Sequence, residues 1–317
     1  MSADFTAVGL AIGHATDEKG ITGLTVLRGV DGPFRGGACV FGRATGTREI
    51  EALASSHASG RVDAVMLTGG SAYGLDAAAG IMRWMEERRR GFDVGVGVVP
   101  IVPSAVIFDL TIGDPAARPS AAMAYTACDA ADTRDIAEGS VGAGTGATVG
   151  KGAGREHAMK GGFGCASRTS GEITVCAAAV VNALGDVRTA DGKILAGARS
   201  KKGQFLDSAK ALSQLATAPA FAAAPQNTTL CVVATNASLD RNELSQLARA
   251  AGAALFKRVT PAGTSLDGDI VIALSQPDGP RGVLMPIEML ATQALEEAIE
   301  RGVRTATARG GFAGLAD

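Results

Sequence analysis

The chain has 317 residues, 46% of them hydrophobic, with 30 Lys and Arg against 32 Asp and Glu and a formal net charge of −2. This hydrophobic content excludes a disordered chain, and the length fits one large domain or two ordinary domains. The near-balanced charge offers no basic surface for nucleic acid or an anionic membrane, so we expect neither as a partner.

Strand-like and helical segments alternate in the first half of the chain, without regular βαβ units. Residues 62–68 predict a buried strand, which a Gly69-Gly70-Ser71 turn joins to an alanine-rich helix over residues 75–90. The β-branched residues 94–106 are interrupted by prolines and predict an edge strand or an extended segment that enters the site. Residues 138–164 are rich in glycine and predict a system of loops.

Two further strand-like runs follow the glycine-rich region. They cover residues 173–181 and 187–195, with a turn signal at Asp191-Gly192. A helix-like run over residues 208–217 comes next.

An apolar connector then separates two parts of the chain. Residues 218–226 are broken by prolines and resemble an exposed connector that ends at Asn227. The next run, residues 229–235 (TLCVVAT), predicts a compact strand. Thr228 therefore lies at the very start of a strand.

The last part of the chain predicts two helices and a strand. Asp240 and Glu243 form a capping box for a helix that ends near Ala254. Residues 269–274 predict a strand and residues 288–301 a final helix. Together the predicted elements favour one layered α/β domain over residues 1–317.

The cysteines and the N-terminal residues indicate the compartment. The five cysteines are scattered without CxxC spacing, which signals neither a disulfide framework nor a zinc site. Residues 1–20 contain acidic residues and only a short apolar stretch, unlike a signal peptide. No apolar run approaches the roughly 20 residues of a membrane helix. We expect a soluble, cytoplasmic protein.

Two patterns nearly match nucleotide-binding loops and fail. Gly150-Lys151 ends like a P-loop, but Thr145 and Gly152 stand where that motif needs a glycine and a hydroxyl. Residues 142–147 fit GxGxxA, yet no convincing strand precedes them. We expect no cofactor, and no metal is signalled.

Histidine-based catalysis has few candidates, since the chain contains only His14, His57 and His157. The turn at Ser71 lies between a predicted strand and helix like a nucleophile elbow, although Tyr73 replaces the last glycine of GxSxG. A serine hydrolase that uses Ser71, with His157 as the only histidine after it, remains an alternative.

An N-terminal threonine needs no histidine. Its hydroxyl is the nucleophile, and its own α-amine, with a pKa of about 7.7–8.0, is the base. Such a residue must first be liberated by cleavage of the chain.

The sequence Asn227-Thr228-Thr229-Leu230, followed by VVATN at residues 232–236, resembles the processing site of the P1 peptidases. This DmpA/S58 family includes β-peptidyl and D-amino-acid aminopeptidases and nylon-oligomer endohydrolases. The resemblance extends over nearly the whole chain, through TGGSAYGLDA (68–77), PIVP (100–103), FDL (108–110), GTGATVGK (144–151), VN (181–182) and LDGD (266–269). It implies an αββα sandwich related to the N-terminal-nucleophile hydrolases, usually assembled as homotetramers or larger oligomers.

The resemblance also implies a role for each matching residue. Thr228 would attack its own Asn227 carbonyl and then substrate amides, so that the chain divides into residues 1–227 and 228–317. Lys151 would lie near the nucleophile, where a cation favours the neutral amine.

Three further positions match family residues around the nucleophile. Asn182 would donate to the developing oxyanion, and Tyr73 would contribute to the oxyanion hole or touch the substrate. Asp267 and Asp269 would orient the hydroxyl and amine of Thr228.

The expected activity is hydrolysis of short amides that carry a free amine, such as peptides with D- or β-residues or aminohexanoate-type oligomers. The threonine nucleophile is similar to the nylon-hydrolase branch, whereas many aminopeptidase members carry serine. An acyltransferase related to the ornithine acetyltransferases and a non-enzymatic binding protein remain alternatives.

Overall fold

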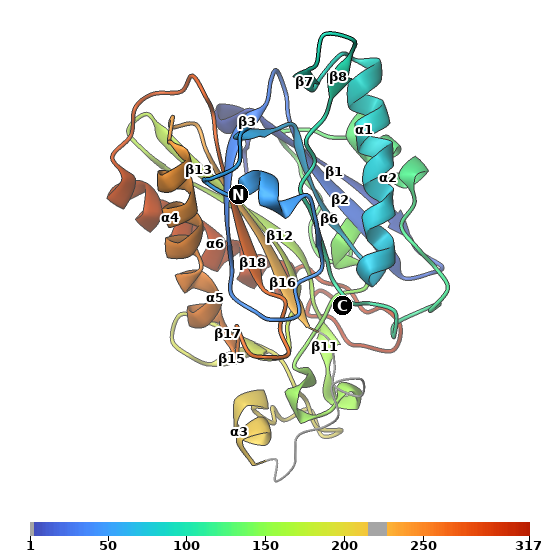
Figure 1. Ribbon diagram of the computed structural model, residues 1–317. Coiled ribbons are helices and arrows are strands. Elements are labelled where there is room, and N and C mark those ends of the chain that lie inside the picture. Colours follow the sequence, from blue (N-terminus) through green and yellow to red (C-terminus); the bar gives the residue numbers. More distant parts are fainter. Residues whose placement is uncertain (1–2, 215–226) are drawn as a thin grey trace.

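Two β-sheets lie face to face, with helices on both outer sides (Figure 1). The computed structural model describes residues 3–214 and 227–317. The five-stranded sheet has the order β1-β2-β6-β9-β4, with the bounds Leu10–Asp17, Thr22–Gly29, Ala64–Thr68, Ser104–Val106 and Thr47–Arg48. The six-stranded sheet has the order β12-β13-β16-β18-β3-β5, with the bounds Gly162–Ser170, Ile173–Asn182, Thr228–Thr235, Ile270–Ser275, Phe34–Val40 and Arg61–Val62.

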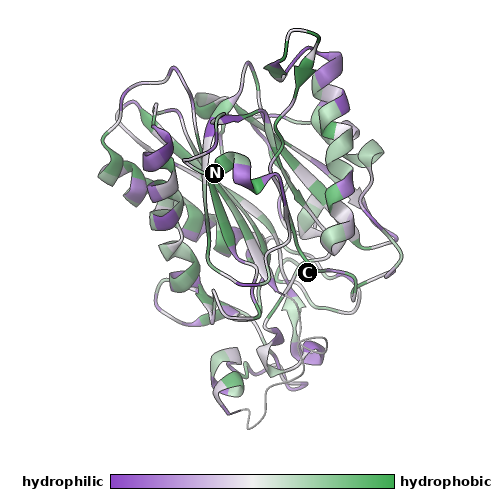
Figure 2. Cartoon of the chain, viewed as in Figure 1, coloured by the Kyte–Doolittle hydropathy of each residue, from purple (hydrophilic) through white to green (hydrophobic). Residues whose placement is uncertain are grey.

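The central strands of the six-stranded sheet are buried on both faces. Along β16, Leu230 and Val232 point into the core between the sheets, whereas Cys231 and Val233 pack under the outer helices. This alternation follows from the period of two along a strand, and it explains why the run reads as continuously apolar. Figure 2 shows the apolar residues gathered on the strands of both sheets.

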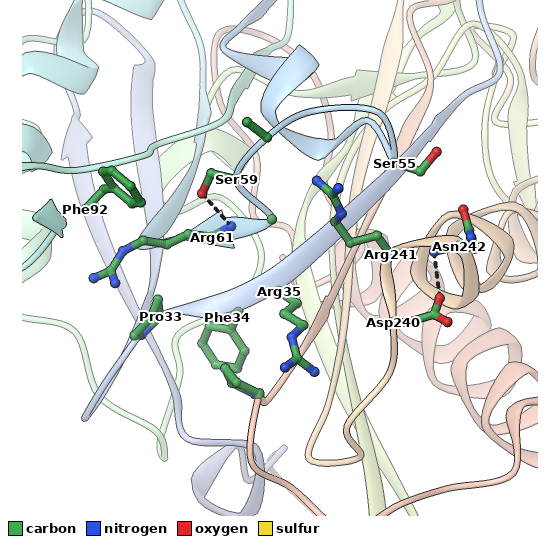
Figure 3. A pocket seen from close by; sticks show the side chains of 13 residues that line it. Pro33, Phe34, Arg35, Ser55, Ser59, Arg61, Phe92, Asp240, Arg241 and Asn242 are labelled. Atoms are coloured by element: carbon green, nitrogen blue, oxygen red, sulfur yellow. Dashed lines mark hydrogen bonds between the residues drawn. The ribbon is translucent and has the colours of Figure 1, made fainter. Parts of the chain in front are cut away.

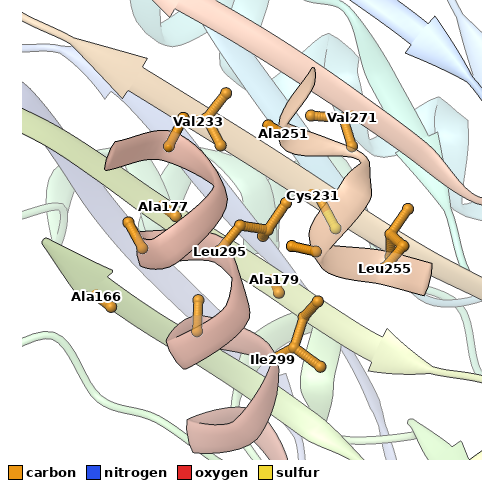
Figure 4. Close-up of a cluster of buried hydrophobic side chains, with 14 of the residues drawn as sticks. Ala166, Ala177, Ala179, Cys231, Val233, Ala251, Leu255, Val271, Leu295 and Ile299 are labelled. Atoms are coloured by element: carbon orange, nitrogen blue, oxygen red, sulfur yellow. The ribbon is translucent and has the colours of Figure 1, made fainter. Parts of the chain in front are cut away.

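The outer helices cover one sheet each. Ile81 of α1 (Ala78–Glu87) and Ala124 of α2 (Ala121–Asp129) pack on the five-stranded sheet. The six-stranded sheet is covered by α4 (Arg241–Ala251), α5 (Ala253–Arg258) and α6 (Leu284–Arg304). Figure 4 shows how small side chains such as Ala177 and Ala179 let α6 lie close to β13.

Short elements surround one end of the six-stranded sheet. The strands β10 and β11 pair as a hairpin, and β14 lies between β15 and β17, with the bounds Thr148–Val149, Met159–Lys160, Asp186–Arg188, Ile194–Ala196 and Val259–Thr260. A second small hairpin is formed by β7 (Phe92–Asp93) and β8 (Val98–Val99). The helix α3 covers Ser208–Ser213. The 3-10 turns have the bounds Thr6–Val8, Ile50–Leu53, Ser71–Ala77, Gly142–Gly144, Lys151–Ala153 and Arg155–His157.

Several predicted elements are confirmed. β6, β13, β16 and β18 lie where the sequence predicts strands, and β16 begins one residue earlier than predicted, at Thr228. The capping box of α4 forms as predicted, although the helix breaks at Gly252 before α5. The predicted helix over 208–217 is α3 in its first part, while residues 215–217 and the connector over 218–226 lie outside the described residues.

Other predictions are wrong in part. The helix predicted over 75–90 begins as a 3-10 turn and is α-helical only over Ala78–Glu87. The segment 94–106 is not an edge strand, because β9 lies between β6 and β4. The run 187–195 is a hairpin of β14 and β15 around the predicted turn, and the glycine-rich region 138–164 contains the start of β12.

The described residues hold neither a membrane-spanning helix nor a cluster of metal-binding side chains. None of their helices is long and apolar enough to span a membrane. In the same residues, no group of His, Cys, Asp and Glu side chains could hold a metal ion.

Candidate active site

The carbonyl group of Asn227 lies between two hydrogen-bond donors. Thr228 is the first residue of β16 and is 4% exposed, and its Oγ1 donates to the carbonyl oxygen of Asn227 at 2.6 Å. The backbone N–H of Gly268 donates to the same oxygen at 2.7 Å. The peptide bond predicted to be cleaved is therefore polarised from two sides, by the predicted nucleophile and by a fixed backbone dipole.

Gly268 can approach this closely because it has no side chain. A Cβ atom at position 268 would lie 2.8 Å from the Oγ1 of Thr228 and 2.8 Å from the carbonyl oxygen of Ala44. Real Cβ atoms do not come so near, so any other residue would displace Thr228 or the loop that carries Ala44.

The acidic residues on either side of Gly268 are buried. Asp269 accepts from the backbone N–H of Thr229 at 2.6 Å and from that of Gly263 at 2.9 Å. Asp267 accepts from the backbone N–H and the hydroxyl of Thr264, at 2.9 and 2.6 Å. Burial raises the pKa of both carboxyl groups, and with the neighbouring charge of Asp267 it brings the pKa of Asp269 to about 7.

Lys151 is buried on the other side of Thr228. Its Nζ donates to the Oδ1 of Asn182 at 2.8 Å, and to the carbonyl oxygens of Asn182 and Thr148 at 3.1 Å each. Burial lowers the pKa of Lys151 to about 7, against the opposing attraction of Asp267. The lysine can therefore change its protonation state near neutral pH.

Asn182 joins Lys151 to the nucleophile. It is the last residue of β13 and lies opposite Thr228 in the antiparallel pairing with β16. Its Oδ1 is occupied by Lys151 and by the backbone N–H of Thr148, at 3.1 Å. Its Nδ2 makes only a long contact of 3.4 Å to the carbonyl oxygen of Phe108, so the donor side of the amide can turn to another acceptor.

A pocket of about 340 Å³ opens beside Thr228. Its walls come from the loop after β3, the turn after β6, the segment after β9 and the start of β16. The lining residues are Arg43, Ala44, Thr45, Gly46, Ser71, Ala72, Val106, Phe108 and Thr228. The expectation that residues 94–106 lead into the site is met by Val106.

Tyr73 lies apart from this network. Its side chain is 63% exposed, and the guanidinium of Arg118 stacks on its ring at 4.5 Å from the centroid. Among the described residues, Tyr73 does not line the pocket that contains Thr228. No hydrogen bond or ring contact between described residues joins Tyr73 to Thr228, Asn182 or Lys151.

Ser71 lines the pocket but has no histidine beside it. His14 is buried against Phe163, and burial lowers its pKa to about 4. The Nδ1 of His157 lies 2.9 Å from the carbonyl oxygen of Arg199. Within the part of the chain that the structure describes, no histidine lines the pocket, so a serine triad built on Ser71 lacks its base.

Two parts of this site have no recognisable pattern in the sequence. The N–H of Gly268 is a backbone donor, which no residue pattern marks. Arg43 lies in a loop that only the folded chain brings to Thr228. A search for basic residues in glycine-bounded loops would have offered Arg43 among many others.

A larger cavity of about 900 Å³ lies at the opposite end of the six-stranded sheet. Figure 3 shows Arg35, Arg61 and Arg241 at its wall. Each is already engaged: Arg61 pairs with Asp63 at 2.7 Å, Arg35 donates to Ser238 at 3.2 Å, and Arg241 donates to the carbonyl oxygen of His57.

Comparison with known families and proteins gives a consistent result. The family model described as peptidase family S58 matches residues 5–316. An uncharacterized aminopeptidase of Mycobacterium tuberculosis is 43% identical over 240 residues, which are 74% of this chain and 67% of the relative. A 6-aminohexanoate-oligomer endohydrolase of Agromyces sp. is 28% identical over 279 residues, which are 86% of this chain and 74% of the relative.

Solved structures share the fold. A β-aminopeptidase from Burkholderia sp. aligns with a TM-score of 0.72 at 21% identity, over 99% of this chain and 92% of the other. The L-aminopeptidase D-Ala-esterase/amidase of Ochrobactrum anthropi, described as a variant of the Ntn hydrolase fold, aligns with a TM-score of 0.71 at 21% identity, over 98% and 89%. The αββα sandwich expected from the sequence is thus confirmed.

Proposed function

The chain belongs to peptidase family S58, which makes it an amide-bond hydrolase, and on this premise we propose that Thr228 is its nucleophile, freed when the chain cleaves its own Asn227–Thr228 bond. The observation that carries this proposal is the carbonyl oxygen of Asn227, which accepts from the hydroxyl of Thr228 and from the N–H of Gly268. A peptide bond held in this way has its attacking group and its charge stabilisation already in place.

Self-cleavage would proceed in two steps. The Oγ1 of Thr228 attacks the carbonyl carbon of Asn227, and the N–H of Gly268 stabilises the oxygen that becomes negative. The C–N bond breaks, the nitrogen takes a proton, and an ester joins Asn227 to the hydroxyl of Thr228. Water then hydrolyses this ester, which leaves a carboxylate on Asn227 and a free amine and hydroxyl on Thr228.

Hydrolysis of a substrate would use the same hydroxyl. The free amine of Thr228 takes the hydroxyl proton during attack and passes it to the leaving amine, which gives an acyl-enzyme that water hydrolyses. The amide of Asn182 would give up its long contact with Phe108 to donate to the oxyanion.

The buried charges would keep the amine of Thr228 in its basic form. Lys151 donates to Asn182, which pairs with Thr228 across the two strands. The ammonium group of Lys151 would lower the pKa of the α-amine of Thr228 that cleavage exposes. Asp269 holds the backbone of Thr229, and with Asp267 it would orient the hydroxyl and amine of Thr228.

The substrates would be short amides, either small peptides or amide oligomers. Relatives are named as an aminopeptidase and as a hydrolase of 6-aminohexanoate oligomers. We further propose a homo-oligomer, a tetramer or larger, as the working form.

Mass spectrometry of the denatured protein tests the proposal. The wild type should contain two fragments, residues 1–227 and 228–317, and N-terminal sequencing of the small fragment should begin Thr-Thr-Leu-Cys-Val. Thr228→Ala should remain one inactive chain. A Thr228→Ala variant that still hydrolyses amides would falsify the mechanism.

A further inference from the structure

Arg43 is the single charged residue among the nine that line the pocket beside Thr228. The other lining residues are apolar or carry hydroxyl groups. No carboxylate lines this pocket within the described residues, so it offers no anionic partner for a substrate ammonium group. A cation at its wall repels an ammonium group and attracts an anion.

The backbone on both sides of Arg43 is fixed beside the nucleophile. The N–H of Phe41 donates to the carbonyl oxygen of Asp269 at 2.8 Å, and the N–H of Ala44 donates to that of Asp267 at 2.9 Å. A Cβ at Gly42 would lie 2.0 Å from the oxygen of Asp267, so the loop and the acidic segment pack backbone to backbone. Arg43 therefore starts from a defined position, and only its side chain has to adjust to a ligand.

Arg43 has no protein partner in the part of the chain that the structure describes. It makes no hydrogen bond or ion pair there, in contrast to Arg61, which is held by Asp63 at 2.7 Å. In the same wall, the Oγ1 of Thr45 is buried and has no hydrogen-bond partner among the described residues. The guanidinium of Arg43 thus has its donors free for a carboxylate, whereas the Oγ1 of Thr45 is buried away from a ligand in the pocket.

The rest of the pocket suits a short hydrocarbon. Val106, Phe108 and Ala72 add apolar surface to the lining of the pocket that also contains Thr228 and Arg43. A volume of about 340 Å³ is at the small end of ligand pockets, so a substrate group that enters it is short.

We propose that Arg43 is a specificity-determining residue that binds the free carboxylate of the substrate, so that the enzyme selects short amides ending in a carboxylate. Such substrates are small peptides with a free C-terminus and oligomers of ω-amino acids with a free acid end. The proposal rests on the proposed function, because it takes Thr228 as the reacting residue of this pocket.

Paired substrates test this proposal. The kcat/KM is measured for a short peptide or aminohexanoate oligomer with a free C-terminal carboxylate and for the same compound as its C-terminal amide. The wild type should prefer the carboxylate form at least tenfold, since a hydrogen-bonded charge pair is worth roughly 10- to 100-fold in affinity. In Arg43→Gln this ratio should fall to about one, mainly through KM, while Arg43→Lys should retain part of it.

Arg241→Gln is the matched control, because it removes an arginine from the larger cavity at the far end of the sheet. It should keep the wild-type ratio. Equal kcat/KM for the two forms in the wild type, or an unchanged ratio in Arg43→Gln, overturns the proposal.

A binding experiment separates this proposal from the proposed function. Calorimetric titration of the same two compounds into Thr228→Ala, and into Thr228→Ala with Arg43→Gln, needs no turnover. If Thr228→Ala binds the carboxylate form more tightly than the amide form, and Arg43→Gln removes this preference, the carboxylate site is supported. This result would stand even if the wild type cleaved neither compound, in which case only the proposed function would fail. Turnover without any dependence on Arg43 leaves the proposed function intact and removes the carboxylate site.

Discussion

The two ends of the six-stranded sheet differ in the size of their cavities and in the surroundings of their charged side chains. At the far end, the cavity of about 900 Å³ is open, and Arg35, Arg61 and Arg241 already have partners. At the Thr228 end, the pocket of about 340 Å³ is smaller, yet Lys151 and Asp269 are buried behind it. The larger cavity is thus not the one beside the predicted nucleophile, and the pocket beside Thr228 is marked instead by two buried groups, Lys151 and Asp269, whose pKa values are shifted to about 7.

Burying the charged groups of Lys151 and Asp269 costs free energy of solvation. Taking an ammonium or a carboxylate out of water disfavours its charged form, and burial accordingly moves the pKa of Lys151 and that of Asp269 towards 7 from opposite sides. Well-packed apolar residues would be at least as stable, so buried groups of this kind often mark functional sites, but the equally buried Lys160 shows that burial alone does not assign a function.

Among the variants at the two ends of the sheet, we expect Asn182→Ala to cause the largest loss of kcat. The variant should still cleave itself, because the oxygen of Asn227 accepts from Gly268 and not from Asn182. Its kcat on substrates should fall by roughly 100- to 1,000-fold, the usual loss for one oxyanion donor. Steady-state kinetics on the processed variant, with circular dichroism to check folding, gives the answer; near-wild-type turnover would remove Asn182 from the oxyanion hole.

Replacing either acidic residue should produce two defects from one cause. In Asp267→Asn and Asp269→Asn, self-cleavage and substrate hydrolysis should both slow by about tenfold or more, because in the proposed mechanism both steps would use the hydroxyl that these residues would orient. The time course of fragment formation and the turnover of the processed protein measure the two steps separately. If both variants process and turn over normally, the pair serves only the turn around Gly268.

The stability of the Thr228 end should depend on pH through Lys151. Its pKa is lowered from 10.5 to about 7 on folding, so between these values the unfolded chain holds a proton that the folded chain has lost. Stability therefore rises with pH across this window, by up to about 1.4 kcal/mol per pH unit, whereas below it the destabilisation by this group is at its full size and no longer changes with pH.

Lys151→Met tests this in the uncleaved Thr228→Ala background, where a single chain unfolds. The difference in unfolding free energy between Thr228→Ala and its Lys151→Met derivative should shift in favour of the lysine form as pH rises from 7 to 9. Urea titrations at several pH values measure it. Lys160→Met in the same background is the positive control. Burial lowers the pKa of Lys160 to about 7 as well, so replacing it should change the unfolding free energy with the same dependence on pH while Lys151 is retained.

The smallest effect is expected at the far end of the sheet. Arg61→Gln removes a half-buried ion pair with Asp63 and should cost about 1–3 kcal/mol of stability, since Asp63 remains buried. Processing and kcat/KM should stay within about twofold of the wild type, within the usual scatter of neutral substitutions. A tenfold loss of turnover in this variant would contradict the contrast between the two ends.

Strand patterns in the sequence predict β13, β16 and β18 well, because these strands are buried on both faces and read as apolar runs. The strand patterns do not predict β3 or β12, because glycines interrupt the apolar residues of both strands. A Cβ at Gly37 would lie 2.7 Å from the backbone of Leu244 in α4, and one at Gly164 would lie 2.3 Å from the carbonyl oxygen of Ala298 in α6. A glycine that admits a helix backbone looks in sequence like a glycine in a loop.

The candidate site also contains residues that the sequence predicts and residues that it does not. The positions of Lys151, Asn182 and the acidic pair follow from resemblance to the family, and the structure brings them together around Thr228. Arg43 and the N–H of Gly268 depend on a loop packing backbone to backbone against a turn, which no local pattern encodes.

The placement of β16 and β18 in the sheet affects how the protein could refold after the proposed cleavage. Both strands lie after Thr228, yet they sit in the middle of the sheet, between β13 and β3, which lie before it. If the chain is cut before Thr228 as proposed, the two fragments would be interleaved in one sheet and could not separate without opening it. Folding of the precursor is a first-order event, but reassembly of the denatured mature protein would be second-order and would depend on concentration. If the proposed cleavage occurs, we therefore expect the mature protein to refold less readily after denaturation than the uncut chain, because its two fragments would have to find each other.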